Sequence, residues 1–103
     1  MKIIERISDR INEEISDAKL YAKMAAEVKN EFPALSHVLY TISTQEVEHQ
    51  AMLHEQVVKL IEQYRREHGE PPAAMRAVYD YLHKQSVEKL EEAKRYQEIY
   101  KNS

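Results

Sequence analysis

The chain of 103 residues contains no cysteine, one glycine (Gly69) and three prolines (Pro33, Pro71 and Pro72). Without cysteine it has no disulfide framework, no thiolate zinc site and no iron centre held by cysteines. The lack of cysteine also fits a reducing compartment, and we expect a cytoplasmic protein. Because glycine and proline are the strongest helix breakers, their scarcity beside abundant Ala, Glu, Lys, Leu, Ile and Gln predicts an all-α protein.

Long apolar runs and an excess of positive charge are also lacking. No apolar stretch approaches the roughly 18 residues needed to cross a bilayer. Residues 1–10 alternate charged residues with isoleucine, unlike a signal peptide. The formal net charge is −3, and acidic and basic residues are interspersed, which leaves no basic patch for nucleic acid or for a membrane surface. We therefore expect neither nucleic acid nor membrane as a partner.

The few helix breakers divide the chain into three predicted helices. Breaks at 30–33 and 68–72 leave helices over 2–29, 34–67 and 73–101. A short turn makes the first two helices an antiparallel hairpin, to which a C-terminal helix is added. A chain of this length forms one domain at most, and we expect a single helical domain over 1–103. Self-association is a natural way to enlarge the core of so small a domain.

Apolar residues recur every three or four positions in each predicted helix, as in packed helices. In the first helix the expected inner stripe comprises Ile4, Ile7, Ile11, Glu14, Ala18, Tyr21, Ala25 and Val28. In the second it comprises Leu35, Leu39, Ile42, Glu46, His49, Leu53, Val57, Leu60 and Tyr64. The third helix has a weaker stripe, Tyr79, Leu82, Leu90, Ala93, Tyr96 and Tyr100, and is expected to pack on the bundle or on a neighbouring subunit.

Three polar residues interrupt these stripes at one level of the hairpin. If the turn is centred near Glu31, Glu14 lies about 17 residues before it, and Glu46 and His49 lie about 15 and 18 residues after it. At a rise of about 1.5 Å per residue, the three fall within roughly one helical turn of each other. Neither stripe supplies a Lys or Arg near this layer, and buried carboxylates need a compensating cation. We therefore expect a metal ion bound by Glu14, Glu46 and His49.

The ligand types indicate which metals suit this site. Carboxylate oxygens with one imidazole favour iron or manganese, and zinc is an acceptable substitute. Carboxylate-bridged di-iron bundles use one Glu from each of two helices and Glu-x-x-His from each of the other two. This chain supplies half of that set, so a twofold homodimer would complete a ferritin-like four-helix bundle with two irons per dimer.

The residues around this layer resemble a known family. The similarity extends over residues 8–65, and its most specific parts are Glu13-Glu14-Ile15, Tyr21 and the segment Glu46-Val47-Glu48-His49-Gln50-Ala51-Met52. This pattern resembles the encapsulated ferritins, half-length members of the ferritin-like superfamily that are related to rubrerythrins.

The resemblance implies a ferroxidase whose di-iron site is shared between two subunits, with Fe(II) and dioxygen or peroxide as substrates, for iron storage or detoxification. It also implies Tyr21 beside the site, Glu13 near the path by which iron arrives, ring-like assembly of dimers, and an encapsulin shell as partner. The apolar targeting peptide usual in that family is not recognisable, because the chain ends in a charged helix and Ile99-Tyr100-Lys101-Asn102-Ser103.

Other interpretations remain open at this point. Tyr21 is either a core aromatic or a hydrogen-bond partner of the metal carboxylates. Glu13 and Glu48 lie off the stripes and fit a solvated face, although Glu48 could orient a ligand from behind. His54 fits a surface position and His83 a structural role. The chain could also be a rubrerythrin-like peroxide reductase with an external electron donor, or a non-enzymatic helical interaction module whose polar layer sets the register.

Overall fold

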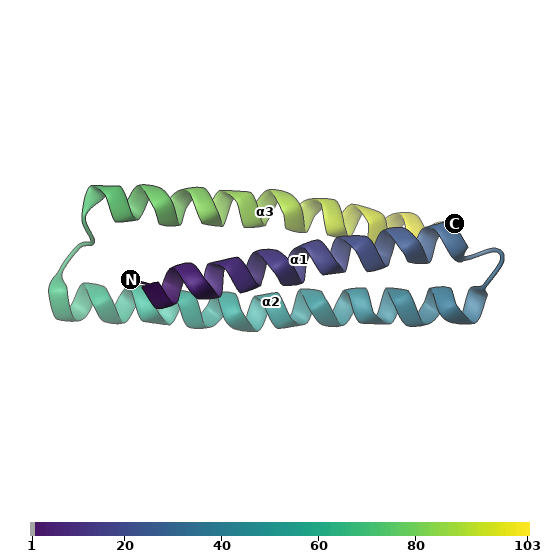
Figure 1. Cartoon of the computed structure of the whole chain (residues 1–103), viewed down its shortest axis with the longest axis horizontal. Coiled ribbons are helices and arrows are strands. Elements are labelled where there is room, and N and C mark those ends of the chain that lie inside the picture. The colour runs from purple at the N-terminus through teal and green to yellow at the C-terminus, as the bar shows by residue number, and fades with distance from the viewer. Residues whose placement is uncertain (1) are drawn as a thin grey trace.

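The computed structural model describes residues 2–103, which form three helices and no strand. These helices are α1 (Lys2–Val28), α2 (Pro33–His68) and α3 (Ala73–Lys101), and they lie side by side in a rod about 56 Å long and 18 Å across (Figure 1). The predicted all-α class is confirmed, and each predicted helix end lies within one residue of the observed one.

The helix ends follow from the local sequence. Pro33 opens α2, where its missing N–H costs no hydrogen bond because the first-turn amides have no partner within the helix. Gly69 ends α2 with φ of 76°, a left-handed conformation that suits glycine, and its N–H donates to the carbonyl of Arg65 at 2.9 Å. Pro71 and Pro72 follow and stop the helix from continuing. The two turns therefore reverse the chain where the breakers predicted.

Helix α1 is the centre of the molecule. It packs closely against α2 and somewhat less closely against α3, whereas α2 and α3 hardly touch each other (Figure 1). The expectation left open for the third helix is thereby resolved, because α3 lies against its own chain. Side-chain contacts between α1 and α3 include Lys19 with Glu92 at 3.2 Å and Asn12 with Ser86 at 3.0 Å.

The buried face of α1 differs from the predicted stripe. Ile7, Glu14, Tyr21 and Val28 were expected inside but are only half-buried. The buried residues of α1 are Ile4, Ser8, Ile11, Ile15, Ala18, Ala22 and Ala25. The prediction assumed one partner helix, and α1 has two, so its inner face is turned toward the groove between α2 and α3.

The stripes of α2 and α3 were predicted only in part. The buried residues of α2 are Ser36, Leu39, Ser43, Gln50 and Val57, of which two belong to the predicted stripe. Leu35 and His49 are exposed in the single chain, and the rest of that stripe is half-buried. In α3 only Ala93 is buried, and the other stripe residues are half-buried. Much of the predicted stripe of α2 therefore lies at the edge of the contact between α1 and α2.

Small side chains allow α1 and α2 to approach closely. Ala18, Ala22 and Ala25 on α1 are completely buried, and so are Ser36 and Ser43 on α2. The Ser36 hydroxyl donates to the Ala25 carbonyl at 2.5 Å, and the Ser43 hydroxyl donates to the Ala18 carbonyl at 2.6 Å. These hydrogen bonds satisfy the two buried hydroxyls and set the height of α2 on α1.

The Ser43 hydroxyl also contacts α3. The side-chain amide of Gln97 donates to it at 3.0 Å, so Ser43 joins all three helices.

Within residues 2–103, no helix combines the length and the apolar character needed to cross a membrane.

We predict that Ala22→Leu lowers the free energy of unfolding by about 1–3 kcal/mol, because the larger side chain must push α1 and α2 apart. Urea denaturation followed by circular dichroism measures the change. Ala77→Leu, at an exposed position of α3, is the matched control and should leave stability nearly unchanged. Equal stability of the two variants would contradict the close packing of α1 on α2.

Candidate metal centre

Glu14 of α1 and Glu46 and His49 of α2 form one cluster. One ligand atom from each residue lies within 4.8 Å of the other two, and residues 2–103 contain no other group of three potential metal ligands this close together. Glu46 and His49 share a face of α2 because they are three residues apart. The predicted alignment of these residues across the antiparallel hairpin is therefore observed.

The cluster has nearly the dimensions of a metal site. Two donor atoms bound to one ion at about 2.1 Å can be at most about 4.2 Å apart. The Oε2 atom of Glu14 lies 3.7 Å from Nδ1 of His49, already inside that limit. Rotation of the Glu46 and Glu14 side chains would bring all three donors onto one ion. The residues present therefore fit a divalent metal with oxygen and imidazole ligands.

The cluster is less buried than expected. The side chain of Glu14 is 18% exposed, whereas that of His49 is 55% exposed. Sequence periodicity placed both residues in an apolar core layer, which in the single chain holds in part for Glu14 and is wrong for His49. His49 extends from the α1–α2 hairpin with much of its imidazole accessible, so one face of the cluster is open.

A cation near the cluster was also missed. Arg10 lies one turn before Glu14 on α1, and its Nη2 atom is 3.9 Å from Oε1 of Glu14. The same guanidinium pairs with Glu13 at 2.5 Å. The expectation that neither stripe supplies a Lys or Arg near this layer holds, but Arg10 reaches Glu14 from outside the stripe. The spacing i, i+4 on α1 predicts this contact, and Arg10 lies outside the apolar stripe.

The other predicted site residues lie around the cluster but outside it. Tyr21 is half-buried two helical turns after Glu14. Glu13 is exposed and pairs with Arg10, and Glu48 is exposed on α2. Among the described residues, none of these three belongs to the group of ligand atoms. Their expected roles in iron access and catalysis stay predictions.

The cluster opens on the side of the hairpin away from α3. Lys19 on α1 and His54 on α2 both contact α3. Lys19 lies five residues after Glu14, and His54 lies five residues after His49. Five residues correspond to about 140° around a helix, so both ligands lie far from the side that α3 covers.

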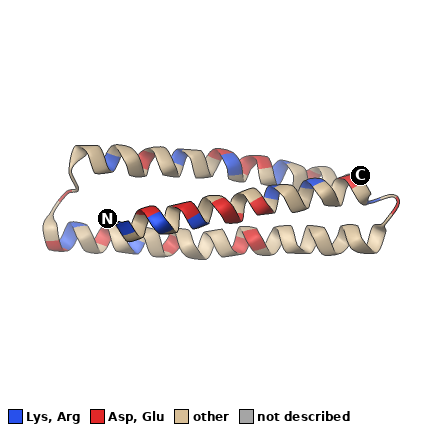
Figure 2. Cartoon of the chain, viewed as in Figure 1, with Lys and Arg blue, Asp and Glu red and all other residues tan. Residues whose placement is uncertain are grey.

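The part of α2 beside the cluster is poor in charge, whereas α1 is charged there. From Pro33 to His54, α2 contains no Lys, Arg, Asp or Glu except Glu46 and Glu48, a gap visible in the half of α2 nearest the α1–α2 turn (Figure 2). Three exposed apolar side chains, Leu35, Val38 and Met52, lie 14, 11 and 3 residues from His49, and at these spacings they share its face. They are 50%, 53% and 66% exposed.

This chain matches no protein-family model, no curated protein and no solved structure. The chemistry of the cluster is therefore inferred from its own side chains.

We predict that Arg10→Ala strengthens Mn²⁺ binding by about threefold to tenfold, because it removes a positive charge close to a ligand. Mn²⁺ is the probe because it does not oxidise in air at neutral pH, and calorimetric titration measures its affinity. Arg66→Ala, at an exposed position near the far end of α2, removes the same charge as a control. Weaker binding by Arg10→Ala would show that Glu14 does not ligate the metal.

Proposed function

We propose that this chain is half of a ferritin-like ferroxidase, in which two copies share one site that oxidises Fe(II) to Fe(III). The observation that supports it is the cluster of Glu14, Glu46 and His49, with ligand atoms within 4.8 Å of one another. One lone Glu and one Glu-x-x-His are half of the ligand set of a carboxylate-bridged di-iron bundle.

The open face supports a twofold dimer. Its exposed apolar side chains, Leu35, Val38 and Met52, would be removed from water if a second copy packed there. The same contact would cover the exposed imidazole of His49 and bring a second Glu14, Glu46 and His49 close to the first. Two α1–α2 hairpins then make the four helices, and each α3 lies on the outside.

The side chains of this chain account for metal binding and charge balance in the proposed reaction. Glu14 and Glu46 supply carboxylates that neutralise bound Fe(II) and stabilise the higher charge of Fe(III). His49 binds as a neutral imidazole. Iron is the substrate: two Fe(II) give one electron each to dioxygen, which takes up two protons from solvent and leaves as hydrogen peroxide. With peroxide as oxidant, the same two electrons and two protons yield two waters.

A helical interaction module without metal is the second candidate, and a specific contact favours it. Arg10 and a protonated His49 both lie near Glu14 and could balance its charge without an ion. Against this, Arg10 is largely exposed and also pairs with Glu13, and exposed ion pairs contribute only about 0–1 kcal/mol. The two candidates differ in whether Fe(II) is bound and oxidised.

We predict that Glu46→Ala and His49→Ala each reduce Fe(II) oxidation to the rate in buffer, because each variant removes one ligand from both halves of the shared site. Stopped-flow absorbance after mixing anaerobic Fe(II) protein with air-saturated buffer measures the rate. Glu62→Ala and His37→Ala change the same residue types at exposed positions of α2 and should oxidise iron as the parent does.

Full oxidation rates in Glu46→Ala and His49→Ala would contradict the proposal. If the parent chain binds Fe(II) but turns over peroxide only with an added reductant, without accumulating ferric product, a rubrerythrin-like peroxide reductase is favoured instead.

We predict that Val38→Lys prevents dimerisation and leaves the helix content unchanged, because it places a charge in the proposed contact but outside the core. Light scattering after size-exclusion chromatography measures the mass. Val78→Lys makes the same change at an exposed position of α3 and should leave the mass of the parent. A dimer that survives Val38→Lys and is lost in Val78→Lys would place the contact on α3.

A further inference from the structure

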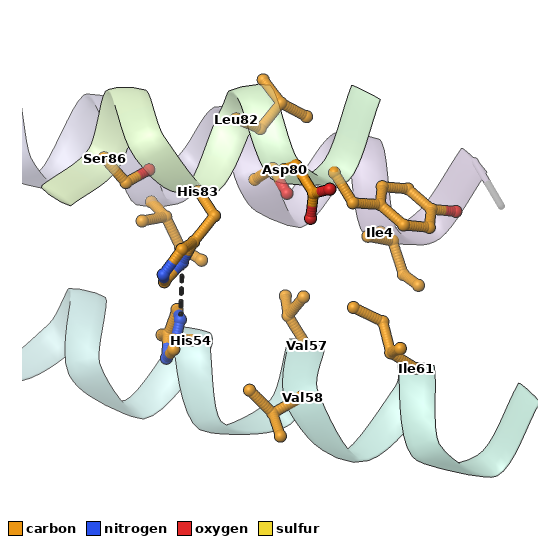
Figure 3. Close-up of a pocket in the computed structure, with 12 residues that line it drawn as sticks. Ile4, His54, Val57, Val58, Ile61, Asp80, Leu82, His83 and Ser86 are labelled. Atoms are coloured by element: carbon orange, nitrogen blue, oxygen red, sulfur yellow. Dashed lines mark hydrogen bonds between the residues drawn. The ribbon is translucent and has the colours of Figure 1, made fainter. Parts of the chain in front are cut away.

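A pair of histidines lies between α2 and α3, on the side of α2 that faces α3. His54 of α2 and His83 of α3 face each other, with Nε2 of His54 at 3.3 Å from Nδ1 of His83 (Figure 3). The ring centroids are 5.3 Å apart and the rings are inclined by 32°. Sequence analysis placed His54 on the surface and His83 in a structural role, and neither was expected to have the other as a partner.

The pair spans a gap between two helices that otherwise hardly touch. Beside it, α2 and α3 enclose a cavity of about 220 Å³ over α1 (Figure 3). Half of the residues that line the cavity are aliphatic, with Ile4, Ile11, Val57 and Ile61 among them. His54 is half-buried at the edge of this cavity, and His83 is exposed. The two imidazoles therefore join the middle parts of α2 and α3 through a polar contact.

The separation of the two nitrogens matches a chelated ion. Zinc binds histidine nitrogen at about 2.0–2.1 Å, and a tetrahedral angle between two such bonds places the nitrogens about 3.3 Å apart. The ion would lie off the line that joins the nitrogens, which requires only a rotation of each ring about χ2. That torsion is broad for histidine, so the adjustment costs little.

We propose that His54 and His83 form a second metal site, which binds Zn²⁺ or Cu²⁺ and ties α3 to α2. Imidazole ligands favour these ions over Mn²⁺ and Mg²⁺, which prefer oxygen. Asp80 and Ser86 lie one turn before and one turn after His83 and line the same cavity. The Asp80 carboxylate does not form a close group of three ligands with the two imidazoles, and the Ser86 hydroxyl donates to Asn12. Water completes the coordination on the exposed side of His83.

This site is separate from the proposed iron centre. His54 lies five residues after His49, which corresponds to about 140° around α2, and on the side that contacts α3. The ligand sets also differ, because the first cluster has two carboxylates and one imidazole and the second has two imidazoles. Removal of the first site should therefore leave zinc binding at the second intact, whether or not the chain is a ferroxidase.

The alternative is a simple N–H···N hydrogen bond between two neutral rings. In that case one ring donates the proton that the other accepts, and no ion is needed. For a metal to bind both facing nitrogens, the donor ring must change tautomer, so that its proton moves to its other ring nitrogen. A substitution that keeps a hydrogen-bonding side chain but removes the imidazole distinguishes the two, because glutamine donates and accepts hydrogen bonds but is a poor zinc ligand.

The test is a calorimetric Zn²⁺ titration of the full chain carrying Glu46→Ala and His49→Ala, so that the first site contributes nothing. We expect one Zn²⁺ per chain and a melting temperature that rises with zinc. Adding His54→Gln or His83→Gln should remove the ion and the thermal shift while the circular dichroism spectrum stays helical. Adding His37→Gln, at an exposed position of α2, should leave both unchanged.

Two results would overturn the proposal. One is an absence of zinc binding in the protein that lacks the first site but retains both histidines and its helix content. The other is an unchanged zinc stoichiometry in both His54→Gln and His83→Gln. As a check that does not depend on variants at the first site, Co²⁺ bound to the parent chain should lose part of its visible absorption in His83→Gln.

Discussion

The close antiparallel contact between α1 and α2 determines the rest of the structure. The carbonyls of Ala18 and Ala25 on α1 accept hydrogen bonds from Ser43 and Ser36 on α2. These contacts fix the position of one helix along the other. Because these hydrogen bonds set the register, Glu14 lies level with Glu46 and His49. Neither a loop nor a strained backbone is needed to place it there. A rigid helical scaffold of this kind positions ligands more accurately than a loop does.

The position of α3 divides the hairpin into two sides with different properties. One side is covered by α3, and there the internal polar contacts are found, including Gln97 with Ser43 and His54 with His83. The other side carries the carboxylate cluster among exposed apolar residues and has no covering element within residues 2–103. Burial of that side would remove apolar surface from water. It would also raise the electrostatic cost of the carboxylates, which a bound cation offsets.

Much of this arrangement was predictable from sequence, and the errors have a common cause. Gly69 and the prolines located the turns, and counting residues from the first turn placed Glu14 level with Glu46. Stripe periodicity failed because it assumed one partner per helix, so Ile15 and Ala22 were missed. The same counting from Gly69 places His54 about 15 residues before the second turn and His83 about 14 after it, which would have revealed that pair. Exposure of His49 could not be deduced, since it depends on which side α3 covers.

The most direct test of the shared iron site is anaerobic sedimentation of the parent chain with increasing Fe(II), with iron measured in the sedimenting boundary. The proposed site requires two chains for each pair of irons. We therefore predict a dimer that carries one iron per chain at saturation. Iron bound in full to a chain that sediments as a monomer would contradict a site shared between two copies, and a dimer without iron would make the polar layer a feature of packing alone.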